Sequence, residues 1–328
     1  MKYTQSRLAR ILTSTSMSLV LAVGCCTAWA QPFPSRPVKL IVPFTAGGSV
    51  DAMGRAIGQG LTEQLGQPVI VDNRPGADGA IGTSEVIRAR ADGHTLLMAT
   101  NTQILAVPTL RLKPPYDPLT ALAPVGMLGQ SAFFMYVHPS LPVNNLKEFI
   151  AYAKANPGKL SYAYGNSTGN LAGAQLTRLA GLQMTAVPYK GEAPAVPDLI
   201  AGRVQMMLAS TTSMLAMAKD GKLKAVALIG EQRSSLAPDV PTFDEAGLKG
   251  ITILPWVGIF APQGTPAEVV SRLSRDLGNW LRQPASVRLL EQQGLSPAVK
   301  SPAETTAFIS SQLQVWTRLV NEAGIERE

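Results

Sequence analysis

Short apolar segments alternate with amphipathic helical patterns along most of the chain, and no other feature restricts the fold so strongly. In the first part, strand-like segments lie at 38–42, 69–71 and 95–99, with helical patterns between them at about 50–65 and 80–90. Strands separated by helices in this way predict a parallel sheet covered by helices on both faces. We therefore expect an α/β unit at the start of the chain.

A second block with the same rhythm begins at the apolar segment 133–137. Asn145 can cap the helical pattern that follows, because Glu148 lies three residues further on and apolar residues continue at helical spacing. Further strands are expected at 160–164, 204–208 and 223–229, again separated by helical patterns. A chain of 328 residues is long enough for two such units, each with its own core.

After the apolar segment 256–260, the pattern is helical up to the C-terminus. Pro266, Pro284 and Pro302 each stand where a helix can begin, which is a favoured position for proline. We therefore expect helices alone in this last part.

The N-terminus has the three parts of a secretory signal peptide. Lys2, Arg7 and Arg10 supply the positive charge, the stretch 11–23 is apolar, and an A-x-A site ends at Ala30. The apolar stretch is shorter than the roughly 20 residues that span a bilayer. We predict that residues 1–30 are removed after Ala30 and that the chain is exported to the periplasm.

Both cysteines of the chain, Cys25 and Cys26, lie within this segment, so the exported form needs no thiol. A lipid-modified Cys25 is the alternative, because the residues before it loosely resemble a lipoprotein processing site. Removing the segment lowers the net charge from +7 to about +4. Basic runs and aromatic-basic patterns are absent from the sequence, which argues against nucleic acid as a partner.

The segment Gly165-Asn166-Ser167-Thr168-Gly169 matches the nucleophile elbow of serine hydrolases. Those enzymes place the histidine after the serine, whereas His94 and His138, the two histidines of this chain, both precede Ser167. Other triads use a preceding histidine, and a Ser/Lys pair with Lys190 would need none. We interpret Ser167 as a hydrogen-bond donor, and a secreted serine hydrolase remains the alternative.

Metal and nucleotide sites have no support in the sequence. Two separate histidines and no cysteine in the exported part leave only carboxylates, and no calcium-binding loop pattern occurs. Neither a phosphate-binding P-loop nor a dinucleotide fingerprint follows any expected strand. We expect neither a metal nor a cofactor.

Glycine and small polar residues gather where expected strands end. One such loop covers 44–49, a second covers 165–170, and a third, 100–102, carries three hydrogen-bonding side chains. Open parallel sheets bind ligands at these strand ends, and backbone N–H groups at the start of a helix favour anions. One loop in each α/β unit predicts a ligand held between the two units.

Six segments together resemble the Bug family, the periplasmic receptors of tripartite tricarboxylate transporters. They are PSRPVKLIVPFTAGGSVDAMGRAIGQGL, GQPVIVDNRPGADGAIG, PVNNLKEFIAYAKANPGKLSYAYGNSTG, VPYKG, LAPDVPTFDEAGL and WVGIFAPQGTP, in this order over nearly the whole exported chain. The resemblance implies a two-lobe fold that closes by a hinge on a small carboxylate. It also implies that the loop at Phe44–Gly48 holds the carboxylate through backbone N–H groups and waters, and that Asn166–Asn170 completes the site.

Several positions differ from the pattern that the resemblance implies. Asn170 stands where histidine is common, Tyr164 replaces a small residue, Ala209 replaces a frequent aspartate, and Thr45 replaces proline. Because an amino-acid ligand needs an acidic partner for its ammonium group, the missing aspartate at 209 argues against such a ligand. Asp51 is still available, although a first-turn aspartate can also simply complement the helix dipole. The identity of the ligand stays open.

Together these arguments predict an α/β protein with two lobes of mostly parallel sheet, lobe 1 formed by 34–131 and 256–328 and lobe 2 by 132–255. The protein is expected to be a monomeric receptor, not an enzyme, that delivers a small carboxylate to a membrane transporter or serves a signalling sensor instead. The predicted ligand-binding residues are Phe44, Thr45, Ala46, Gly47, Gly48, Asp51, Thr100, Asn101, Thr102, Asn166, Ser167, Thr168, Gly169, Asn170 and Tyr189.

Overall fold

The computed structural model of the chain describes residues 33–210, 212–322 and 327. The predicted signal peptide, its cleavage site and Cys25 lie outside these residues. The chain divides between Ser35 and Arg36 into two units. Both sheets and the cavities described below belong to the second unit.

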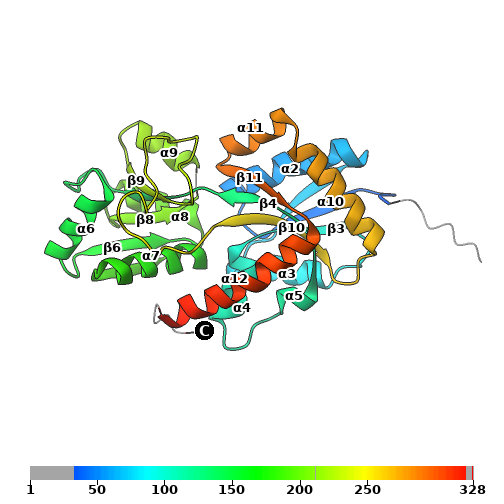
Figure 1. Ribbon diagram of the computed structural model, residues 1–328, viewed down its shortest axis with the longest axis horizontal. Helices are drawn as coiled ribbons and strands as arrows, with labels where there is room; N and C mark the ends of the chain where they lie inside the picture. The colour runs from blue at the N-terminus through cyan, green and yellow to red at the C-terminus, as the bar shows by residue number, and fades with distance from the viewer. Residues whose placement is uncertain (1–32, 211, 323–326, 328) are drawn as a thin grey trace, which may run out of the picture. The chain divides into compact units, whose positions relative to one another are not determined.

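The first sheet has six strands in the order β11-β4-β10-β3-β1-β2 (Figure 1). Its strands are β1 (Val38–Val42), β2 (Val69–Asn73), β3 (Thr95–Thr100), β4 (Leu122–Ser131), β10 (Trp256–Pro262) and β11 (Leu295–Lys300). We call this sheet and its helices lobe 1. The helices are α2 (Ser49–Leu65), α3 (Ala80–Ile87), α4 (Val107–Leu110), α5 (Pro118–Ala121), α10 (Ala267–Leu281), α11 (Pro284–Gln292) and α12 (Pro302–Glu322), with short turns at Ala77–Gly79 and Thr102–Ala106.

The second sheet has five strands in the order β7-β6-β8-β5-β9. They are β5 (Phe133–Val137), β6 (Leu160–Tyr164), β7 (Met184–Pro188), β8 (Met206–Ala209) and β9 (Lys224–Ile229). The helices α6 (Leu146–Ala155), α7 (Ser167–Ala180), α8 (Glu192–Ile200) and α9 (Thr212–Lys219) accompany this sheet, and we call the whole lobe 2.

The expected two-lobe α/β arrangement is present, but both sheets are mixed rather than mostly parallel. In lobe 1, β1 pairs in parallel with β2 and β3, whereas β10 pairs antiparallel with β3 and β4. The chain leaves lobe 1 through β4 and returns to it through β10, so two neighbouring strands run in opposite directions. Antiparallel pairing at this point follows from that path.

Three strands, β4, β7 and β11, were not expected from the sequence. Glycine and proline weaken the strand pattern in β4 and β11, because both residues are unfavourable in most strands. Gly129 of β4 is required here, since a Cβ atom at this position would lie 2.2 Å from the carbonyl oxygen of Ser296 in β11. The predicted all-helical C-terminal part is therefore wrong at β11.

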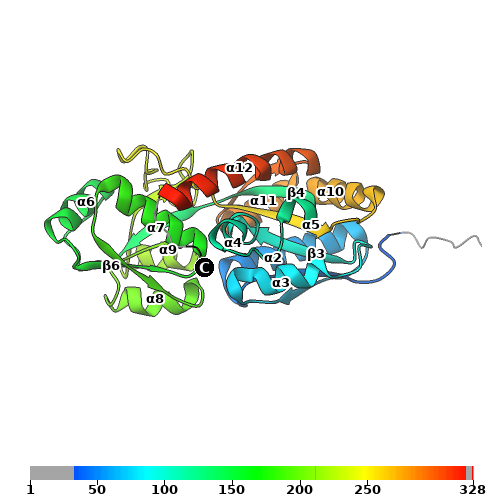
Figure 2. The same cartoon turned by 90° about the horizontal axis from the view of Figure 1, so that it is seen from below.

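One hydrophobic core contains buried side chains of both lobes, among them Met135, Leu171, Trp256 and Trp316. Helix α12 carries Trp316 and extends from lobe 1 to α7 of lobe 2 (Figure 2). There Arg178 and Glu322 form an ion pair at 3.1 Å. This core holds the strand ends of the two sheets beside each other.

Candidate functional site

A cavity of about 310 Å³ lies between the two lobes. Residues of both lobes line it, and most of them stand where a strand ends and a helix begins. Nine of the predicted ligand-binding residues line this cavity: Phe44, Thr45, Gly47, Gly48, Thr100, Asn101, Thr102, Asn166 and Thr168. The structure thus brings the three predicted loops together around one cavity.

Six predicted residues do not line this cavity: Ala46, Asp51, Ser167, Gly169, Asn170 and Tyr189. Three of them, Ser167, Asn170 and Tyr189, line a smaller neighbouring cavity of about 100 Å³ together with Asp78 and Arg111. The hydroxyl of Tyr189 donates to Asp198 at 2.7 Å. A ligand-binding role for these residues stays a prediction.

Three helices begin at the cavity wall. Helices α2 and α8 follow Gly48 and Gly191, and neither of these glycines supplies a side-chain cap. Helix α7 follows Asn166, whose side-chain oxygen accepts a hydrogen bond from the backbone N–H of Gly169 at 2.9 Å. The first N–H groups of a helix and its dipole attract negative charge, so this wall favours an anion.

Asp51 does not line the cavity, but it supports the lobe 1 loop 44–49 through hydrogen bonds. Its buried carboxylate accepts hydrogen bonds from the N–H of Gly47 at 2.9 Å and from the side chains of Arg55 and Asn73 at 3.1 and 3.0 Å. Asn73 also donates to the carbonyl oxygen of Phe44 at 3.1 Å. The N–H of Gly47 therefore points to Asp51, which differs from the expectation that it holds the ligand.

The pKa of Asp51 lies below its ordinary value. Burial by itself would raise this pKa, but the hydrogen bonds from Gly47, Arg55 and Asn73 and the positive charge of Arg55 outweigh it. The carboxylate therefore stays ionised and keeps the loop in place.

The glycines of the GNSTG segment serve close packing between backbones. A Cβ atom at Gly165 would lie 2.2 Å from the backbone nitrogen of Glu192, and one at Gly169 would lie 3.2 Å from the carbonyl oxygen of Leu208. These glycines allow the start of α7 to approach α8 and β8. The match to a nucleophile elbow thus has a packing explanation.

Ser167 has no histidine as its partner. Its hydroxyl donates a hydrogen bond to the carboxylate of Asp78 in lobe 1. His94 precedes β3, whose opposite end lines the cavity, and bonds to Asp92. His138 follows Val137, which pairs with Met206 at the end of β8 that is remote from Ser210. Both histidines therefore lie at strand ends away from the cavity.

The third predicted loop is the start of a helical segment. Thr100 ends β3, and Thr102 begins the turn Thr102–Ala106. Asn101 holds the strand crossing into lobe 1, because its amide donates to the carbonyl of Leu254 and accepts from the N–H of Trp256, both at 2.8 Å. The side chain of Asn101 therefore fixes the position of the segment that leads from lobe 2 into β10.

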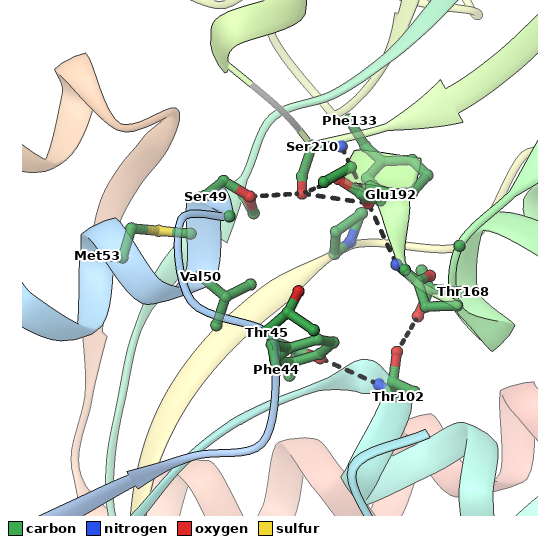
Figure 3. Close-up of a pocket in the computed structure, with 18 of the residues that line it drawn as sticks. Phe44, Thr45, Ser49, Val50, Met53, Thr102, Phe133, Thr168, Glu192 and Ser210 are labelled. Atoms are coloured by element: carbon green, nitrogen blue, oxygen red, sulfur yellow. Dashed lines mark hydrogen bonds between the residues drawn. The ribbon is translucent and has the colours of Figure 1, made fainter. Parts of the chain in front are cut away.

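Glu192 lines the cavity at the start of α8, although it was not among the ligand-binding residues predicted from the sequence (Figure 3). Its carboxylate accepts hydrogen bonds from the side chain of Asn166 at 3.1 Å and from the hydroxyl of Ser210 at 3.3 Å. The sequence signal was an acidic residue directly after the glycine of VPYKG, at the first position of a helix. Among the described residues that line the cavity, Glu192 is the one with a charged side chain.

Among the residues that the structure describes, three side-chain hydrogen bonds connect the lobes beside the cavities. Thr102 and Thr168 are joined through their hydroxyls at 3.1 Å, and Ser49 and Ser210 through theirs at 3.2 Å (Figure 3). Beside the smaller cavity, Ser167 bonds to Asp78. In each pair one partner belongs to lobe 1 and the other to lobe 2. These contacts hold the lobes together around the cavity.

The remaining wall is largely apolar. The apolar residues that line it are Phe44, Val50, Met53, Phe133, Ala193, Val196, Pro197, Met217, Pro255, Trp256 and Val257. Within the described ranges, no group of three or more His, Cys, Asp or Glu side chains is placed to hold a metal ion. The site thus combines helix starts, hydroxyls and one carboxylate with an apolar wall.

Known proteins share this arrangement. The sequence model of the tripartite tricarboxylate transporter family receptor matches residues 53–325. The chain belongs to this receptor family. It is 36% identical to Protein BugT of Bordetella pertussis over 97% of this chain and 98% of that protein. The fold of this chain is the expected two-lobe fold of periplasmic binding proteins, which solved structures of similar proteins confirm.

Two solved structures of similar proteins carry carboxylates. Rpa4515 of R. palustris with adipate is 32% identical, covers 90% of this chain and 99% of its own, and has a TM-score of 0.85. MatC of Rhodopseudomonas palustris with bound malate is 31% identical, covers 88% of this chain and 100% of its own, and has a TM-score of 0.80.

Membership of a receptor family confirms that the chain is a solute-binding protein and not an enzyme. The alternative of a secreted serine hydrolase is thereby excluded. No helix in the described part of the chain is both long and apolar enough to cross a membrane.

Proposed function

We propose that this receptor works in the periplasm, where it binds a small carboxylate between its two lobes and delivers it to a membrane transporter. The observation that carries this proposal is the convergence of three helix starts, those of α2, α7 and α8, on one cavity. Backbone N–H groups can bind a carboxylate there, and the described lining contains no lysine or arginine. The adipate and malate bound by relatives support the same ligand class.

In this proposal two of the three helix starts bind the carboxylate, that of α2 in lobe 1 and that of α7 in lobe 2. In lobe 1, Gly48 leads into α2, whose first N–H groups at Ser49 and Val50 are the candidate donors. In lobe 2, Asn166 and Thr168 stand at the start of α7. A ligand that contacts both walls stabilises the closed arrangement, because only that arrangement brings both walls within reach.

A thermal-shift screen of carboxylates with three to six carbons tests the binding step. A ligand at a hundredfold excess over its Kd should stabilise the folded protein by about 2.7 kcal/mol. The corresponding amide should bind far more weakly, because it lacks the negative charge. The same ligand should also reduce the radius of gyration in solution scattering. Equal binding of acid and amide would contradict the carboxylate assignment.

Export and delivery need a separate experiment in cells. A tagged chain should be found in the periplasmic fraction, with an N-terminus at Gln31 if cleavage follows Ala30. Deleting its gene should abolish uptake of the ligand found in the screen, and the full chain should restore it. Uptake that is unchanged by the deletion would contradict delivery to a transporter.

A further inference from the structure

We propose that the ligand is a monocarboxylate that also carries a hydrogen-bond donor, best an ammonium group, and that this donor faces Glu192. The inference deepens the proposed function and rests on it. It comes from the directions of the hydrogen bonds around Glu192 and from the charge of its carboxylate.

The hydroxyl protons of Ser49 and Ser210 both point toward Glu192. A carboxylate only accepts, so the hydroxyl of Ser210 must donate to Glu192, at 3.3 Å to one oxygen and 3.4 Å to the other. This uses the single proton of Ser210. Ser49 must then be the donor in the 3.2 Å contact between the two serines. Both hydroxyl protons are thereby directed along the chain from Ser49 through Ser210 to Glu192.

The consequence is a wall of acceptors, which we call the acceptor wall and define as Ser49, Ser210 and Glu192. All three residues line the cavity (Figure 3). The side-chain hydroxyls of the two serines offer a ligand only oxygen lone pairs, and Glu192 adds negative charge. A ligand group placed there must donate hydrogen bonds, and a second carboxylate would meet both acceptors and a like charge.

The side chain of Asn166 connects Glu192 of the acceptor wall to the start of α7. Its side-chain nitrogen donates to Glu192 at 3.1 Å, while its oxygen accepts from the N–H of Gly169. Glu192 is also the first residue of α8, where a carboxylate complements the helix dipole. The cavity therefore has N–H donors and a fixed acceptor wall close together, which suits a ligand that bears both a carboxylate and a donor.

The apolar residues of the cavity restrict the rest of the ligand. Phe44 and Phe133 come from different lobes, and Val196 and Met217 add aliphatic surface in lobe 2. A short hydrocarbon body fits such a wall better than further polar groups do. The ligand class is thus a small monocarboxylate with an apolar body and an amino group, with a hydroxyl group as the weaker substitute.

The test compares ligands of equal length by calorimetry with the purified full-length exported chain. The ligands have four, five or six carbons. At each length, the dicarboxylate is compared with three monocarboxylates, which carry an α-amino group, an ω-amino group or an ω-hydroxyl group. We expect the best amino acid of the set to bind at least tenfold more tightly than every dicarboxylate. Glu192→Gln should reduce this preference at least tenfold.

Glu268→Gln is the control, because Glu268, like Glu192, is a glutamate in the first turn of a helix, here α10, but it is exposed and does not line the cavity. It should leave the preference unchanged. If dicarboxylates bind the unaltered protein as tightly as the amino acids, or if a folded Glu192→Gln variant keeps the full preference, this inference is overturned while carboxylate binding stands. Should no carboxylate of any set bind, the proposed function fails and the inference with it. If Glu192→Gln does not fold, the comparison with the unaltered protein decides alone.

Discussion

The hydroxyl of Ser167 in lobe 2 donates a hydrogen bond to the carboxylate of Asp78 in lobe 1. Ser167 is the first residue of α7, and Asp78 lies in the turn Ala77–Gly79 with a φ of 55°, a region that few residues other than glycine adopt. The serine of an apparent nucleophile elbow thus contacts the opposite lobe. The hydroxyl proton of Ser167 therefore forms a hydrogen bond between the two lobes.

We predict that Ser167→Ala weakens ligand binding by about 1–2 kcal/mol, because a hydrogen bond to a charged group that forms on closing is lost. Asp78→Asn should have a smaller effect, since the amide oxygen still accepts from Ser167. Titration calorimetry with the ligand from the screen measures both changes. Covalent labelling of Ser167 by a fluorophosphonate probe would contradict this role.

The position of the site was predictable because it follows from local patterns. Glycine and small polar residues after 38–42 and 160–164 predicted two loops, and both loops lie at the cavity. Ligands usually bind at the strand ends of α/β sheets, so the order of predicted strands and loops along the sequence was enough to locate the site. The direction in which each side chain points needed the structure.

Asp51 and Glu192 show why the roles of single residues were not predictable. Asp51 is bound by Asn73, which lies 22 positions away, so its role as a support for the loop depends on a tertiary contact. Glu192 reaches the cavity because α8 packs against Gly165, a close approach that the sequence does not reveal. Similarly, β11 forms only because Gly129 of β4 gives it room.

The contact between Thr102 and Thr168 predicts a measurable coupling between the lobes. Each Thr→Val change removes one hydroxyl of the 3.1 Å pair, and both residues are buried. In a double-mutant cycle on ligand affinity, we expect a coupling energy of about 0.5–1.5 kcal/mol. Thr102→Val combined with Thr306→Val in the exposed part of α12 should be additive. A coupling energy of zero for the first pair would mean that the contact plays no part in closing.

Gly47 and Gly48 should respond differently to alanine. Gly47 has a φ of +85°, so Gly47→Ala should cost about 1–2 kcal/mol of stability through backbone strain alone. Gly48 has an extended backbone with a φ of −83°, and a Cβ atom there would meet only the carbonyl oxygen of Thr45 at 3.6 Å. Gly48→Ala should therefore leave the free energy of unfolding within about 0.5 kcal/mol.

The larger Gly48→Val change then separates binding from folding. Its side chain extends into the cavity that Gly48 lines, so ligand binding should be lost while the fold persists. Urea unfolding and calorimetry measure the two properties independently. Equal and mild effects of all three glycine variants would show that this loop is only a turn.

Asp51 makes the stability of lobe 1 depend on pH in a defined direction. The pKa of Asp51 is lower in the folded chain than its ordinary value of 3.8, because the hydrogen bonds from Gly47, Arg55 and Asn73 outweigh burial. A lowered pKa gives stability that is fully present above the unfolded pKa and is lost as the pH falls through the folded pKa. Asp51→Asn should therefore cost about 1.5–3 kcal/mol at pH 7, the range for a hydrogen bond to a charged group. The difference from the unaltered protein should stay constant down to about pH 5 and shrink below about pH 4. Urea unfolding between pH 3 and pH 7 measures this difference, and a gap that remains constant down to pH 3 would show that Asp51 is not held in its charged form by the loop.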